Sequence, residues 1–233
     1  MAAPDDSGGG LRGSRANLCH DVTVMRTPTV RAVRAALGTG GLAILLADVV
    51  RTVNATGGID LGNYVGQFTI LSVAFTSILM ILGAVRGRDG RAGVHVRAMA
   101  LTGLGVAAVL HATLLGGTAG PSGELVNLLL HTVFPVLALL EWALVPSSRA
   151  VRWFTPLIGL AFPVIFLAAT LVRGATVDWY PYDFVDPGAQ GGYGGLVGSL
   201  AIVLVAFLTV GAVVTAIGMV RDRVARPRAR SHG

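Results

Sequence analysis

Two stretches of this sequence place a hydroxyl, an imidazole and amide groups inside otherwise apolar surroundings. Thr69 follows Gln67 at the start of one apolar run, and His131 follows Asn127 at the start of another. A histidine can accept the proton of a hydroxyl that would otherwise be a poor nucleophile at neutral pH. We therefore predict that Thr69 acts as a nucleophile and His131 as its general base.

Further polar residues accompany this pair and could orient the imidazole or stabilise an oxyanion. The sequence does not choose among these candidates, which are Asn127, Glu124, His111, Gln67 and Tyr64. Glu124, Asn127 and His131 recur at intervals of three and four residues, which places them on one face of a helix. The alternative interpretation of His131 is a structural histidine that is hydrogen-bonded between helices.

Four other polar residues have simpler explanations. Ser72 and Thr76 continue the helical spacing of Thr69, and we expect each hydroxyl to bond the carbonyl oxygen four residues earlier. Asp48 and Arg51 stand three residues apart, which favours an ion pair within one helix.

The elements that must position these residues are membrane helices. Of the 233 residues, 53% are hydrophobic and only 13% are charged, whereas an ordinary soluble domain has about 25% charged residues. Six apolar stretches reach the roughly 20 residues needed to cross a bilayer. They cover residues 31–51, 64–85, 96–116, 125–145, 154–172 and 196–220. The sequence thus predicts an all-α fold, a polytopic membrane bundle of six transmembrane helices.

The arginines predict the orientation of this bundle, since basic residues in short loops stay on the cytoplasmic side. Of the 18 basic residues, all of them arginine, 16 lie in or next to the two tails and the second and fourth connections, and only Arg51 and Arg173 lie elsewhere. Both ends are therefore predicted to be cytoplasmic. A rise of about 1.5 Å per residue then places Thr69 and His131 at similar depth in the outer half of the bundle.

We expect three parts: a flexible cytoplasmic tail over 1–29, the transmembrane domain over 30–220, and a basic cytoplasmic tail over 221–233. The absence of lysine, with the bias toward Ala, Gly, Val and Arg, indicates a bacterium of high genomic GC content and hence an integral protein of the bacterial plasma membrane. The arginines lie at the edges of apolar runs, which disfavours a nucleic-acid partner.

The outer connection over 173–195 is long and rich in aromatic residues. Trp179 and Tyr180 could belong to an aromatic belt at the membrane surface. A structured cap is the alternative, because Pro181 and Pro187 restrict the backbone and long connections in compact bundles are often functional.

Three motifs resemble a known family. The stretch LLLHTVFPVLALLEWAL at 128–144 is similar to the fourth-helix motif of the androgen-induced-gene family of six-span membrane proteins, although Pro135 follows His131 by four residues and not five. The segments NYVGQFTILSVAF at 63–75 and WYPY at 179–182 resemble that family's second helix and outer loop. The resemblance implies a threonine hydrolase of fatty-acid esters of hydroxy fatty acids, whose required Thr and His correspond to Thr69 and His131.

Two other functions remain open at this point. The polar residues could form a pocket that binds a lipid or another partner without catalysis. Less favoured is a haem protein in which His111 and His131 are facing ligands. For the hydrolase we expect no cofactor, and membrane lipids or fatty-acyl esters as partners; the sequence does not indicate the oligomeric state.

Overall fold

The computed structural model describes residues 28–87, 92–115, 119–147 and 149–225, so nearly all of the predicted N-terminal tail and the end of the C-terminal tail lie outside the described residues. The described elements are helical. They are α2 (Pro28–Thr56), α3 (Leu61–Val65), α4 (Phe68–Arg86), α5 (Gly93–Thr113), α6 (Glu124–Leu128), the π-helical turn η1 (Leu129–Val133), α7 (Phe134–Leu144), α8 (Thr155–Gly159), α9 (Ala161–Val177), the 3-10 turn η2 (Asp183–Val185) and α10 (Tyr193–Ala225).

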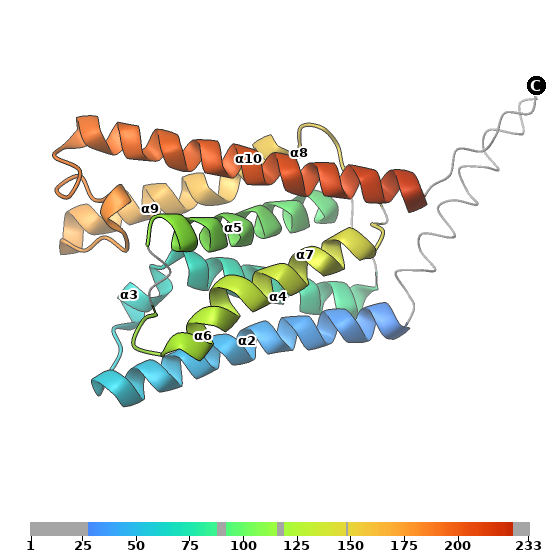
Figure 1. The fold of residues 1–233 in the computed structure, drawn as a ribbon, viewed down its shortest axis with the longest axis horizontal. Helices are drawn as coiled ribbons and strands as arrows, with labels where there is room; N and C mark the ends of the chain where they lie inside the picture. Colours follow the sequence, from blue (N-terminus) through green and yellow to red (C-terminus); the bar gives the residue numbers. More distant parts are fainter. Residues whose placement is uncertain (1–27, 88–91, 116–118, 148, 226–233) are drawn as a thin grey trace, which may run out of the picture.

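Six helical segments among these are long and apolar enough to cross a membrane. Three are the single helices α2, α4 and α5, the fourth runs from α6 through α7, the fifth from α8 through α9, and the sixth is α10. The predicted all-α bundle of six spans is confirmed. The beginning of α2 and the end of α10 lie at the same end of the bundle, which we call the tail end, and α3 and α6 lie at the opposite end, which we call the site end (Figure 1).

The last helix is longer than predicted. It continues to Ala225 instead of ending at 220, so that Arg221 and Asp222 belong to the helix and not to a basic tail. The Arg221 guanidinium donates hydrogen bonds to the Trp142 carbonyl oxygen at 2.7 Å and to Ser147 Oγ at 2.7 Å. These partners explain why a charged residue is buried there. At the other end α10 begins at Tyr193, so the connection after α9 is shorter than the predicted 173–195.

Small residues let the helices approach closely. A side-chain carbon at Gly38 of α2 would lie 2.7 Å from the Ser77 carbonyl oxygen of α4, and one at Gly41 would collide with the Ser77 hydroxyl and the Phe134 ring. Glycine-rich contacts of this kind are common between membrane helices, where lipid supplies no hydrophobic drive for association. The glycines at 38 and 41 therefore set the distance between α2 and α4.

Charged side chains are buried at the tail end of the bundle. Glu141 of α7 accepts hydrogen bonds from Arg34 of α2 at 2.6 Å and from Arg97 of α5 at 2.5 Å, and all three residues are buried. A carboxylate between two guanidinium groups satisfies charges that would be costly to leave alone in a membrane. Some of the arginines that predict the orientation thus also hold α2, α5 and α7 together.

Candidate active site

A polar cavity of about 380 Å³ lies at the site end of the bundle, and we call it the polar arm. It is lined by six of the seven predicted site residues, namely Tyr64, Gln67, Thr69, His111, Asn127 and His131. They come from α3, α5, α6, η1 and the beginning of α4. The fold thus gathers residues that are separated along the chain around one space.

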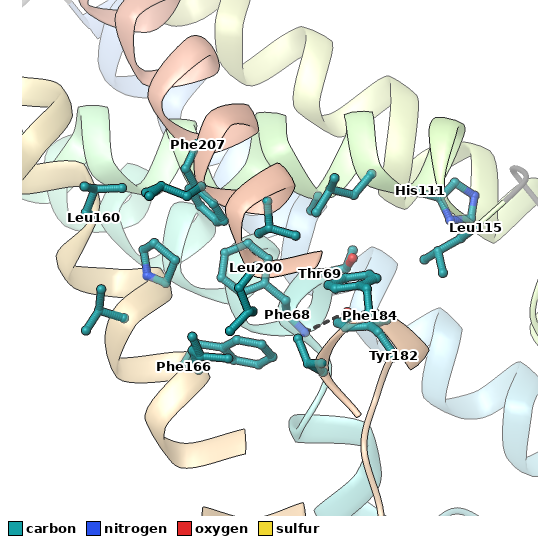
Figure 2. Close-up of a pocket in the computed structure, with 18 residues that line it drawn as sticks. Phe68, Thr69, His111, Leu115, Leu160, Phe166, Tyr182, Phe184, Leu200 and Phe207 are labelled. Carbon is teal, nitrogen blue, oxygen red and sulfur yellow. Dashed lines mark hydrogen bonds between the residues drawn. The ribbon is translucent and has the colours of Figure 1, made fainter. Parts of the chain in front are cut away.

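An apolar cavity of about 130 Å³ lies beside it, and we call it the apolar arm. Its walls come from the beginning of α4, from α5, α9 and α10, and from the residues around η2. Figure 2 shows Phe68, Phe166, Leu200 and Phe207 around this space. A concave, almost wholly apolar lining suits a hydrocarbon chain.

The two arms share four lining residues, which are Thr69, His111, Leu115 and Tyr182. In Figure 2 Thr69 and Tyr182 lie together, with His111 farther along the cavity wall. A ligand that has both an apolar chain and a polar group would therefore place the junction between the two beside the Thr69 hydroxyl.

His131 lies in the π-helical turn η1, and the sequence explains this turn. Pro135 has no backbone N–H, and in an α-helix its ring would clash with the carbonyl group of His131, four residues earlier. The chain widens instead, and the Phe134 N–H donates to the Leu129 carbonyl oxygen five residues before it. The turn presents the His131 ring to the polar arm.

Two contacts hold the His131 imidazole. Nδ1 lies 3.1 Å from the Asn127 carbonyl oxygen. A carbonyl oxygen only accepts, so Nδ1 carries the proton and donates, and Nε2 is left as the basic nitrogen. The His111 ring stacks on the His131 ring with 3.7 Å between centroids and 15° between planes. This stacking leaves no room for a haem between the two rings, so the geometry does not support the bis-histidine alternative.

Thr69 is the second residue of α4, and its side chain is buried beside Tyr182. Tyr182 Oη accepts a hydrogen bond from the Phe68 N–H at 2.9 Å. Burial raises the pKa of Tyr182, and its hydrogen bonds to Phe68 and Thr69 oppose that rise. Among the described residues no hydrogen bond joins Thr69 to His131, although both side chains line the polar arm.

Asp48 is a residue of the site that the sequence analysis misinterpreted. The predicted ion pair with Arg51 is not formed, and Arg51 Nη1 lies instead 3.5 Å from the Ser122 carbonyl oxygen. Asp48 is buried, lines the polar arm and interacts with both Tyr64 and His131. Burial and the neighbouring Asp48 carboxylate raise the pKa of Tyr64. The spacing of three residues favoured a local partner, whereas Asp48 acts on Tyr64 of α3 and, electrostatically, on His131 of η1.

Three further expectations turn out differently. Glu124 is exposed at the start of α6 and lines neither arm, so it faces away from the other candidates. The hydroxyls of Ser72 and Thr76 do not bond their own helix and have no hydrogen-bond partner among the described residues. Both side chains are buried between helices, where packing fixes the rotamer and not local hydrogen bonding.

The connection between α9 and α10 is ordered by side-chain contacts, as a structured cap requires. Arg173 Nη2 donates to Asn63 Oδ1 at 2.6 Å, and the guanidinium lies 4.7 Å from the centre of the Trp179 ring. Tyr180 packs on Gly174, where any side-chain carbon would collide with the ring. Trp179 and Tyr180 thus anchor the segment that carries Tyr182 into the site.

This fold and these cavities define a six-span helical membrane protein with a two-armed, amphipathic cavity at one end of the bundle. No family model, no curated protein and no solved structure matches the chain. The resemblance to the androgen-induced-gene family therefore rests on the three short motifs and the number of spans.

Proposed function

We propose that this protein is an intramembrane threonine hydrolase of fatty-acyl esters and a divergent member of the androgen-induced-gene family. The observation that carries the proposal is the meeting of the polar and apolar arms at Thr69. An acyl chain in the apolar arm and a polar alcohol part in the polar arm would bring an ester carbonyl to the hydroxyl. Proximity of this kind is a large part of catalysis by covalent intermediates.

In the first step the Thr69 oxygen attacks the ester carbonyl carbon, and the hydroxyl proton passes to Nε2 of His131. Since the two side chains are not hydrogen-bonded in the free protein, the proton travels through one water molecule in the polar arm. The bond from the carbonyl carbon to the alcohol oxygen then breaks. The imidazolium returns the proton to the leaving alcohol, and the acyl group stays on Thr69.

In the second step water attacks the acyl-threonine, and His131 accepts one of its protons. The bond to the Thr69 oxygen breaks, the threonine recovers its proton from the imidazolium, and the fatty acid leaves. Asp48 stabilises the imidazolium in both steps because its carboxylate interacts with His131. Tyr64, Gln67 and Asn127 are the candidate donors to the oxyanion, since all three line the polar arm.

The test is covalent labelling by a fluorophosphonate, together with hydrolysis of a panel of lipid esters by the purified protein. Thr69→Ala should abolish labelling, and Thr69→Ala and His131→Ala should each lower turnover by about 100-fold or more. Thr132→Ala is the matched control, because Thr132 adjoins His131 but is exposed. Labelling and turnover that persist in Thr69→Ala would rule out the threonine as nucleophile.

A second candidate function is the binding of an amphiphile without turnover. One observation favours it: the Thr69 hydroxyl has Tyr182, and not a basic group, as its hydrogen-bonding neighbour. In that case the wild-type protein would hydrolyse no ester of the panel, yet it would retain a fatty-acyl ligand through purification. Mass spectrometry of a lipid extract of the protein distinguishes the two functions.

A further inference from the structure

The apolar arm has a side that faces the bilayer. Its walls on that side are α9 and α10, which both pack against α5 and η2 but make little direct contact with each other. The gap between them is filled by the cavity and its lining side chains and not by helix packing. This is unusual for two helices that follow one another in the chain.

The rim of this gap is exposed within the membrane-spanning part of the fold. Val164 of α9 is 61% exposed and Leu204 of α10 is 46% exposed, and both line the apolar arm. Val164 lies near the middle of the span Thr155–Val177. At that depth the neighbouring medium is the hydrocarbon of lipid chains and not water.

We infer that the substrate reaches the site sideways from the bilayer, with a single acyl chain that passes between α9 and α10 at Val164 and Leu204. This inference rests on the proposed hydrolase function and narrows its substrate class to bilayer-dissolved lipid esters. A chain that moves from the bilayer into the apolar arm exchanges one apolar environment for another, so no hydrophobic surface is exposed to water on the way. The polar part of the same lipid then reaches the polar arm at the membrane surface.

Two aromatic rings of the connection between α9 and α10 cover the apolar arm at the site end. Tyr182 and Phe184 stack with 5.0 Å between centroids, and both line the apolar arm. They form the wall of this arm beside η2, and we therefore take the face between α9 and α10 as the route for a long chain. A short, water-soluble ester needs no such route and can reach Thr69 through the polar arm.

Two substitutions at the rim test the route. Val164→Trp and Leu204→Trp place an indole in the gap, and the matched controls Val172→Trp and Val213→Trp place one on exposed faces of the same helices that line neither arm. We compare hydrolysis of p-nitrophenyl palmitate in lipid nanodiscs with hydrolysis of water-soluble p-nitrophenyl acetate. The rim variants should lose about tenfold or more in palmitate turnover, and the control variants should change the turnover of either ester by less than about twofold.

Several outcomes would overturn the route. Palmitate turnover that is unchanged in both rim variants contradicts it, as does an equal loss in the control variants. If the wild-type protein hydrolyses neither ester, the hydrolase proposal fails, and the route is then tested by binding. A fatty-acyl ester with a terminal diazirine in nanodiscs should crosslink to the buried residues Leu110 and Phe207 of the apolar arm, and less so in Leu204→Trp. Crosslinks confined to exposed residues would exclude the route without any reference to catalysis.

Discussion

Immediate neighbours determine the properties of the two candidate catalytic side chains, Thr69 and His131. The Asn127 carbonyl oxygen fixes the proton of His131 on Nδ1, and the His111 ring restricts the imidazole from one side. Asp48 supplies a negative charge that a protonated His131 would need. Thr69 is held beside Tyr182, which comes from the cap and not from the bundle. The chemistry of Thr69 and His131 therefore depends on neighbours from four other segments of the chain.

Tyr182 provides a test of this dependence. Tyr182→Phe removes the acceptor of the Phe68 N–H, so the variant should be less stable by about 1–3 kcal/mol, measured by thermal unfolding in detergent. Tyr193→Phe, at a residue that is 75% exposed, is the control.

Because the pKa of Tyr182 is raised above 10.0, the protonated form is favoured by folding. The stability difference should thus be constant from about pH 6 to pH 9 and be lost only as the pH rises through the raised pKa. A difference that fades near neutral pH would contradict this assignment.

Among the elements, the π-helical turn η1 determines the direction in which the His131 side chain points. Pro135 prevents a regular α-helix at His131, and the wider turn changes the direction in which residues 129–133 point. A regular helix through the same segment would keep the i, i+3, i+7 face that the sequence predicts for Glu124, Asn127 and His131. In the structure Asn127 and His131 line the cavity while Glu124 does not.

Pro135→Ala tests the role of the turn. Alanine restores an N–H that can bond the His131 carbonyl oxygen, so the turn should tighten into α-helix and move the imidazole away from the polar arm. Ester turnover should fall by about tenfold or more, while the unfolding temperature stays equal or rises. Pro146→Ala, in the connection after α7, is the control. Unchanged turnover in Pro135→Ala would show that the turn does not position His131.

The buried charges at the tail end predict a stability effect. Glu141→Ala leaves the guanidinium groups of Arg34 and Arg97 without their shared carboxylate. Removal of one partner from a buried ion pair costs about 3–5 kcal/mol, so the unfolding temperature in detergent should fall markedly. The other glutamate of the chain, Glu124, is exposed, and Glu124→Ala should change stability by less than about 0.5 kcal/mol. Equal stability of the two variants would mean that the ion pairs of Glu141 with Arg34 and Arg97 do not stabilise the fold.

For the whole molecule, six spans place both ends of the described chain on one side of the membrane, and the arginine distribution predicts that this side is the cytoplasm. Arg34, Arg97 and Arg221 are buried in the bundle, so part of the arginine bias has a structural role as well. The remaining arginines still favour cytoplasmic tails, and the two-armed cavity then faces the outer leaflet.

The single cysteine makes the orientation measurable. Cys19 in the N-terminal tail should react with a membrane-impermeant maleimide only after intact cells are permeabilised. The variant Cys19→Ser with Ala189→Cys, at an exposed residue of the cap, should react without permeabilisation. The opposite pattern of reactivity would invert the orientation and place the site in the cytoplasmic leaflet.

The sequence by itself determined the six spans, because the length of an apolar run is set by the thickness of the hydrocarbon core and needs no tertiary contact. It also predicted that Thr69 and His131 lie at similar depth, because the rise per residue of a helix is constant. Both residues do line one cavity.

Only the tertiary structure decided how each helix is rotated about its own axis and where the cap lies. That rotation brings Asp48 within electrostatic reach of Tyr64 and His131, stacks His111 on His131, and places Glu141 between Arg34 and Arg97. Hydropathy cannot supply this information, because a nearly uniform apolar helix presents similar faces in every direction, and specific packing between helices must choose one.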